Sequence, residues 1–314
     1  MQSNLLLIEK YNRLQLSLLV ILSLLFIGII LVNPSILTYY FQYYLLLITV
    51  TIIGIPHGFF DYSVAERLFR NNINWIYYFT AGYVSLSLIY LFLWIHYPLA
   101  SLIFFLMISI FHFGIEELNH IEYKDMSFYQ IFVIGSMPIA LPILFHSSDV
   151  FYIFNQIIGI DINYADINTY MYYLYFSLLF IALYLNGIKR SWVYLILILN
   201  FIVLPPLLSF ILYFCFHHSI RHYIHSIYHD NLVPKKYETK QYLKTIIMTS
   251  VFFAIIVLIS LQAYGQYSFD VIIVKYIFIL LACLTLPHLM LNIYYDTRKL
   301  NTKKITLAIH FYAN

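Results

Sequence analysis

Charged side chains are scarce in this chain. Asp, Glu, Lys and Arg together make up only 10% of the 314 residues, whereas 62% are hydrophobic and the mean hydropathy is +0.82. A typical soluble domain has about 25% charged residues and hides its apolar side chains in one core. The composition therefore excludes a soluble globular protein and predicts an all-α, polytopic membrane protein.

Cysteine is almost absent, and several motifs of soluble enzymes are missing. The two cysteines, Cys215 and Cys283, both lie inside apolar runs, which predicts buried thiols and argues against a disulfide framework. The sequence has no Gly-rich phosphate loop, no Gly-x-Ser-x-Gly elbow and no Cys-x-x-Cys pair. Its net charge of +3 comes from basic residues scattered over short loops, so we expect no nucleic-acid partner.

Long apolar runs dominate what is present. A membrane helix needs about 20 mainly apolar residues, and the sequence contains a series of runs near this length. They cover residues 14–33, 36–56, 74–95, 98–115, 127–146, 168–186, 191–204, 207–228, 242–263 and 270–293. The seventh is short and ends at Pro205-Pro206, so the prediction is about ten spans, or nine if this run does not cross.

These runs predict one transmembrane domain over residues 1–314. The run 14–33 follows basic residues as a signal peptide would, but it is long and lacks a small-x-small cleavage site. It is therefore interpreted as a retained first span. Residues 36–293 are expected to form the core that holds the functional site, and residues 294–314 a basic cytoplasmic tail.

Lysine and arginine predict the orientation, because they concentrate in cytoplasmic loops. With ten spans and a cytoplasmic N-terminus, the C-terminus is also cytoplasmic, and of the basic residues only Lys275 falls near the outer face. The stretch 147–167 contains Asp but no Lys or Arg, as an external loop should. The same topology places a set of histidines toward the cytoplasmic side: His57, His112, His218, His222 and His288.

The stretch from Phe216 to His229 contains five histidines in fourteen residues. At helical spacing His218, His222 and His225 share one face, whereas His217 points about 100° away from His218. Two imidazoles one turn apart are placed like two arms of a single metal site. The alternative is a polar stripe that hydrogen-bonds neighbouring helices, but this density of ionisable residues inside a membrane favours a functional site.

Three shorter patterns accompany this stretch: Gly54-Ile55-Pro56-His57-Gly58 with Asp61, His112-Phe113-Gly114 with Glu116 and Glu117, and Leu286-Pro287-His288. A single histidine at a helix end is typical of a membrane interface, but the shared depth of these histidines favours one site. Imidazole suits iron, copper, zinc and nickel, so spacing alone leaves the metal open. Asp61, Glu116 or Glu117 is expected to accept the second ring N–H of a ligating histidine.

Taken in order, the motifs Pro56-His57-Gly58 with Asp61, His112-Phe113-Gly114 and His218-Ser219-x-Arg221-His222 resemble a known family. It is the Brp/Blh family of integral-membrane β-carotene 15,15′-dioxygenases. The resemblance extends from the second predicted span to the tenth. Each motif is short, but their order, spacing and membrane setting are together fairly specific.

The resemblance implies a non-haem Fe(II) site held by four histidines, His57, His112, His218 and His222. It also implies cleavage of the central double bond of β-carotene by O2 to give two all-trans-retinal, with no catalytic residue beyond the metal ligands. Supporting roles are expected for Asp61, Glu116, Glu117, Arg221, His225 and His288. Whether His217, His225 or His288 joins the ligands stays open at this point.

The family context further implies a multi-pass protein of a bacterial or archaeal cell membrane, in contact with lipid and linked to a microbial rhodopsin that uses the retinal. Three alternatives remain: cleavage of another carotenoid, a carotenoid or retinal binder without catalysis, and a transporter with an intramembrane histidine metal site. A transporter predicts polar residues through the full depth of the membrane, whereas the histidines here gather toward one face. A di-iron desaturase needs more paired histidines than this sequence supplies.

Overall fold

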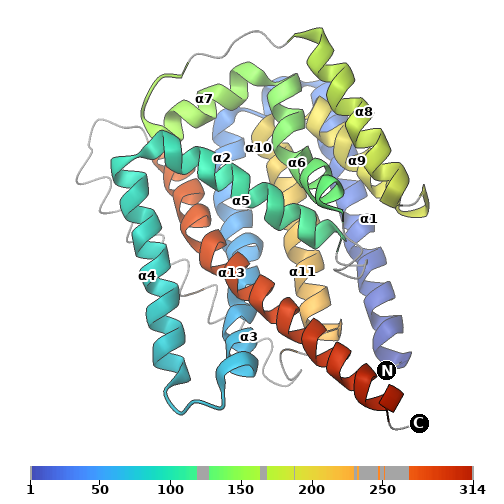
Figure 1. Ribbon diagram of the computed structural model, residues 1–314. Helices are drawn as coiled ribbons and strands as arrows, with labels where there is room; N and C mark the ends of the chain where they lie inside the picture. The colour runs from blue at the N-terminus through green and yellow to red at the C-terminus, as the bar shows by residue number, and fades with distance from the viewer. Residues whose placement is uncertain are drawn as a thin grey trace.

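The computed structural model describes residues 2–118, 127–162, 168–186, 188–229, 232, 247, 251 and 269–312. Within these ranges every regular element is a helix and no strand is present, as the composition predicts. The helices form a bundle in which most elements run roughly parallel or antiparallel to one another (Figure 1). The all-α prediction is confirmed for the described part of the chain.

Five helices are long and apolar enough to cross a membrane, which is compatible with a multi-pass membrane protein. They are α1 (Gln2–Val32), α4 (Trp75–His96), α5 (Pro98–Leu118), α6 (Phe128–Phe145) and α13 (Phe269–Tyr312). Shorter apolar helices are α2 (Tyr39–Thr49) with η2 (Val50–Gly54), α8 (Thr169–Asn186) and α9 (Ile188–Val203). These elements coincide with predicted runs, although they do not establish the count of ten. The run 242–263 lies outside the described residues except at positions 247 and 251.

Helix α7 (Ser147–Ile158) corrects the expectation of an external loop over 147–167. Asp149 lies in its first turn, where a carboxylate stabilises the positive end of the helix dipole, and Gly159 ends it with a φ of 71°. The helix buries Val150, Ile153 and Ile157 and packs against α6 and α13. Its apolar residues recur at helical spacing on one face only, so the segment has too few of them to read as a membrane span.

The predicted span 207–228 is a continuous helix whose backbone pattern changes along its length. It consists of α10 (Pro206–Ile211), η5 (Leu212–Ser219), α11 (Ile220–Ile224) and η6 (His225–His229). Elements η5 and η6 are π-helical, with i→i+5 bonds that occur mainly as short insertions at functional sites. A second irregular stretch combines η2, which is π-helical, with the 3-10 helix η3 (Ile55–Phe59), followed by α3 (Phe60–Phe69).

Side chains satisfy backbone carbonyls of η5. Gln15 of α1 donates to the carbonyl of Phe216 at 2.7 Å, and the Ser219 hydroxyl donates to the carbonyl of Phe214 at 2.8 Å. Inside a membrane an unsatisfied backbone group costs several kcal/mol. The hydrogen bonds from Gln15 and Ser219 therefore stabilise the π-helical stretch, whereas a regular α-helix would not need them.

Helices α5 and α6 cross at glycines. A Cβ atom built on Gly114 would overlap the carbonyl of Ile131, and one built on Gly135 would overlap the carbonyl of Ile110. The two backbones therefore touch directly, and only glycine fits at either position. The Gly114 of the His112-Phe113-Gly114 motif thus serves helix packing, which fixes the part of α5 that carries His112.

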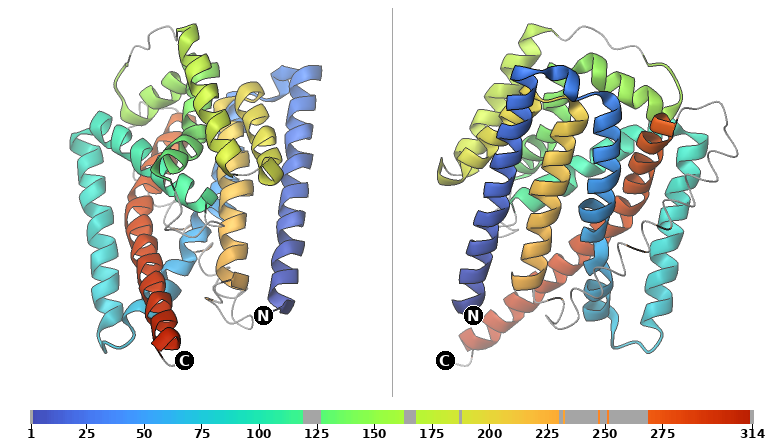
Figure 2. Two further views of the ribbon diagram at one scale, coloured as in Figure 1. Left: turned by 45° about the vertical axis from the view of Figure 1, so that its right-hand side comes forward. Right: turned by 180° about the vertical axis from the view of Figure 1, so that it is seen from behind.

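Helix α13 crosses the bundle obliquely and passes α3, α4, α5 and α7 (Figures 1 and 2). It continues through the predicted tail as far as Tyr312, so this tail is largely helical. Three segments run toward the end of the bundle at which both termini lie: α2–α3, α10–α11 and α13 (Figures 1 and 2). These segments contain most of the histidines that the sequence analysis singled out.

Candidate metal centre

His112 of α5 and His218 of η5 face each other inside the bundle. Their Nε2 atoms are 3.1 Å apart, and the side chains are only 4% and 3% exposed. Two nitrogens that each lie about 2.1 Å from one ion are about 3.0 Å apart at a right angle and about 3.4 Å apart in a tetrahedron. The pair is therefore spaced like two ligands of one metal ion, as well as like a hydrogen-bonded pair.

Two further imidazoles, His222 of α11 and His288 of α13, lie beside this pair. The ring centroid of His288 is 5.2 Å from that of His112 and 5.5 Å from that of His222. Both added histidines are buried. We call His112, His218, His222 and His288 the imidazole cluster. The predicted association of His112, His218 and His222 is thus found in space, and His288 joins them.

Carboxylates hold the outer nitrogens of two rings in the cluster. His222 Nδ1 lies 3.2 Å from Glu116 Oε1, and His288 Nδ1 lies 2.7 Å from Asp61 Oδ1. The Tyr83 hydroxyl donates to the other oxygen of Asp61 at 2.8 Å. A carboxylate on Nδ1 places the proton there, leaving Nε2 with the lone pair that a metal needs. The expected roles of Asp61 and Glu116 as partners of ring N–H groups agree with this geometry.

Glu117 belongs to a different network, next to the cluster. Its side chain is 2% exposed and contacts His217 Nε2 at 2.9 Å and Arg221 at 2.7 Å. The hydroxyls of Tyr194 and Tyr213 donate to the same carboxylate at 3.2 and 3.4 Å. Arg221 also donates to the carbonyl of Glu117, near the end of α5. This network ties α5 to η5, α11 and α9, so Glu117 and Arg221 support the site by fixing helices.

The other predicted histidines lie outside the imidazole cluster or are described in less detail. His57 lies in η3, beside α11 and α13, but its side chain is outside the described part of the structure. Phe60, three residues on, has its ring 6.4 Å from that of His222. His225 begins η6 and is partly buried. His217 and His218 point apart, as predicted, because one contacts Glu117 and the other His112.

The cluster fits a metal ion in donor type, and one pair of its nitrogens has the spacing of two ligands. In the described residues, no three or more His, Cys, Asp or Glu side chains are already arranged to hold an ion. The Nε2 atoms of His112 and His218 have ligand spacing. The ring of His288 lies next to that of His112, and the ring of His222 lies next to that of His288. Buried neutral imidazoles suit iron, copper, zinc or nickel, so the donor set alone does not choose among them.

Sequence reasoning missed Tyr83 and Asn292, which contact Asp61 and His288. Asn292 is one helical turn after His288, so its spacing was a usable signal. Tyr83 is one of 32 tyrosines in an apolar span, and nothing in the sequence marks it as a partner of Asp61.

Aromatic rings surround the cluster. Phe113 lies edge-on to His218 at 5.1 Å between centroids, and Phe214 stacks on the same imidazole at 5.9 Å. Tyr213 is also stacked against it, at 6.4 Å. These rings pack directly on the imidazole of His218 and exclude water from it.

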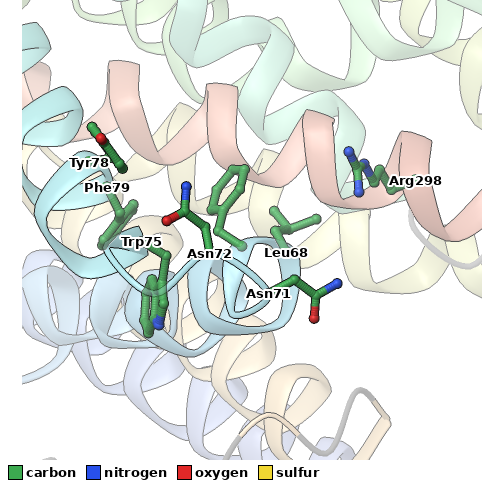
Figure 3. Close-up of a pocket in the computed structure, with 8 residues that line it drawn as sticks. Leu68, Asn71, Asn72, Trp75, Tyr78, Phe79 and Arg298 are labelled. Atoms are coloured by element: carbon green, nitrogen blue, oxygen red, sulfur yellow. The ribbon is translucent and has the colours of Figure 1, made fainter.

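A separate pocket of about 500 Å³ lies between the α3–α4 connection and α13 (Figure 3). It is lined by Leu68, Phe69, Asn71, Asn72, Trp75, Tyr78, Phe79 and Arg298. None of these residues belongs to the imidazole cluster. Arg298 lies ten residues after His288 on α13, a rise of about 15 Å, so the pocket is not the metal site.

A family model for β-carotene 15,15′-dioxygenase matches residues 48–295, well over half of the chain. The chain belongs to the β-carotene 15,15′-dioxygenase family. No curated protein and no solved structure matches it. The matched range contains the whole imidazole cluster, as well as His57, Asp61 and Tyr83. Membership in the β-carotene 15,15′-dioxygenase family indicates dioxygenase activity on a carotenoid.

Proposed function

We propose that this chain is a non-haem Fe(II) dioxygenase that cleaves the central 15,15′ double bond of β-carotene with O2 and forms two all-trans-retinal. His57, His112, His218 and His222 are the proposed iron ligands. The observation that carries the proposal is the buried His112–His218 pair, with its Nε2 atoms at 3.1 Å, in a member of this family. The family model supports the reaction class, while the metal and the bond that is cleaved belong to the proposal.

Iron bound at this site would supply the place where O2 is activated, and the side chains around it would hold the ion and exclude water. The imidazoles hold the ion with neutral nitrogen donors, which suits a ferrous resting state. Glu116 accepts a hydrogen bond from Nδ1 of His222, which fixes the tautomer and leaves the lone pair on Nε2. Phe113 and Phe214 exclude water and flank the polyene. No acid or base is required, so Asp61 has an orienting role.

Carotenoid analysis in a β-carotene-producing host tests this function. We expect the wild-type chain to consume β-carotene and accumulate retinal, and His222→Ala to form no detectable retinal. His96→Gln serves as the control, because His96 is an exposed histidine on α4 outside the cluster. Wild-type retinal yield from His222→Ala would refute the ligand assignment.

Intact β-carotene in all strains, with each protein confirmed in the membrane, would refute β-carotene as the substrate. Other carotenoids supplied to the same strains then test the alternative substrate. We also propose that a microbial rhodopsin uses the retinal in a bacterial or archaeal cell.

We also propose ten membrane crossings with both termini in the cytoplasm. The positions of Lys and Arg support this orientation. The two termini lie at the same end of the bundle, which supports an even number of crossings (Figures 1 and 2).

A further inference from the structure

His288 occupies a central position in the imidazole cluster although it is far from the other members in sequence. Its ring lies against His112 and against His222, at interplanar angles of 83° and 71°. It comes from α13, whereas the other members come from α5 and from the α10–α11 segment. The side chain is 4% exposed, so this polar ring is withdrawn from both water and lipid.

Residues on two other helices fix the direction of His288. Asp61 of α3, itself 4% exposed, holds Nδ1 at 2.7 Å, and Tyr83 of α4 holds the second oxygen of Asp61. Asn292 Nδ2 lies 3.0 Å from His288 Nε2, so Nε2 carries the lone pair and Nδ1 carries the proton. A buried carboxylate–imidazole pair oriented by a third group is the arrangement that supports metal-ligating histidines.

We propose that His288 is a ligand of the same metal centre, with Asp61 and Tyr83 as its positioning residues. The centre then draws imidazoles from α13 as well as from η3, α5, η5 and α11. A cation on Nε2 replaces the Asn292 amide as the partner of the lone pair. This inference rests on the proposed function, because it assumes a metal at the cluster. The competing explanation is that Asp61, Tyr83 and His288 only join α3, α4 and α13.

Metal binding by the purified full-length protein distinguishes these explanations. Anaerobic titration with Fe(II), and with Co(II) as a spectroscopic probe, gives the affinity, the metal content and the Co(II) absorption bands. We expect His288→Ala to bind at least tenfold more weakly and to shift the Co(II) bands. Asp61→Asn should weaken binding by about 10- to 100-fold. Tyr83→Phe should act in the same direction with a smaller effect.

Asn292→Ala should change the metal affinity in the opposite direction to the other variants. Removing the amide removes a competitor for the lone pair, so we expect metal binding to become about 2- to 10-fold tighter. A purely structural role for the Asp61–His288 contact predicts no gain in affinity. His222→Ala is the control for loss of a ligand, and His96→Gln is the control for a histidine outside the cluster.

The outcomes separate the inference from the function. If wild type binds metal, His222→Ala loses it, and His288→Ala keeps wild-type affinity and Co(II) bands, His288 is not a ligand. If His288→Ala does not fold, unchanged affinity and bands in both Asp61→Asn and Tyr83→Phe overturn the inference. If wild type binds neither metal, the proposed function itself fails.

Discussion

Glu117 is a buried carboxylate whose charge is balanced by neighbouring residues rather than by the proposed metal. Arg221 and His217 contact its two oxygens, and two tyrosine hydroxyls complete its shell. A charge in this position is retained only when its partners are in place, because removing one partner leaves the other without compensation. The network therefore holds the His-rich helix in register with α5.

Glu117→Gln should destabilise the protein in detergent. Arg221 keeps 32% exposure, so we expect a loss of about 1.5–3 kcal/mol, the range for a charged hydrogen bond, rather than that of a fully buried pair. Chemical or thermal unfolding monitored by circular dichroism measures the change. Glu9→Gln is the matched control. It breaks the Arg13–Glu9 pair, whose side chains are 77% and 60% exposed, and should cost only about 0.3–0.5 kcal/mol. Equal losses in the two variants would contradict the structural role of Glu117.

At the scale of elements, the contact between α5 and α6 depends on small residues at two positions. Gly114→Ala and Gly135→Ala each place a methyl group against a backbone carbonyl, which cannot move away as a flexible side chain would. We expect each to destabilise the protein by about 1–3 kcal/mol and to lower retinal formation by displacing His112. Gly28→Ala in α1 and Gly82→Ala in α4 are the controls, because nothing lies within 4 Å of a Cβ built there. Tolerance of alanine at Gly114 and Gly135 alike would show that the helices can separate at no cost.

Hydropathy predicted the long helices well and the irregular elements poorly. The run 74–95 corresponds to α4, for example, because a membrane helix must be apolar along its whole length. Helix α7 was expected as a loop, since its single buried face gives it few apolar residues. The π-helical stretches were also missed, because one added residue in a turn leaves the composition unchanged.

The candidate site was predicted in part. Burial cost and depth pointed to His57, His112, His218, His222 and His288 together. The structure brings the last four together, and the side chain of His57 lies outside its described part. The pairing of Asp61 with His288 spans 227 positions and depends on how α13 crosses the bundle. Sequence from a single chain contains no signal for that crossing, so Asp61 could be assigned only to some ligating histidine.

At the scale of the molecule, the proposed metal joins separate helices and should raise global stability. A ligand that binds only the folded state at 100 times its dissociation constant adds about 2.7 kcal/mol. We therefore expect Fe(II) to raise the midpoint of thermal unfolding of the detergent-solubilised wild-type chain and a chelator to reverse the rise. His222→Ala should lose the rise and His96→Gln should keep it. A rise of the same size in His222→Ala would place the metal elsewhere.

Topology is the second prediction at this scale. Cysteines introduced singly at positions near the termini and in the stretch 147–167 can be labelled with a membrane-impermeant maleimide in intact cells. We expect labelling within 147–167 and protection at both termini until the cells are opened. The two native cysteines are buried and free, so they should give little background. Labelling of either terminus in intact cells would contradict the proposed orientation.

The π-helical stretch Leu212–Ser219 amounts to one residue added to an otherwise regular helix. Without that residue the helix would be regular, and the segment after it would be turned by about 100° relative to α10. His218 could then no longer face His112 while Leu207, Leu208 and Ile211 kept their present packing. The extra residue therefore sets the angle between the packed first half of this helix and the half that carries His218 and His222.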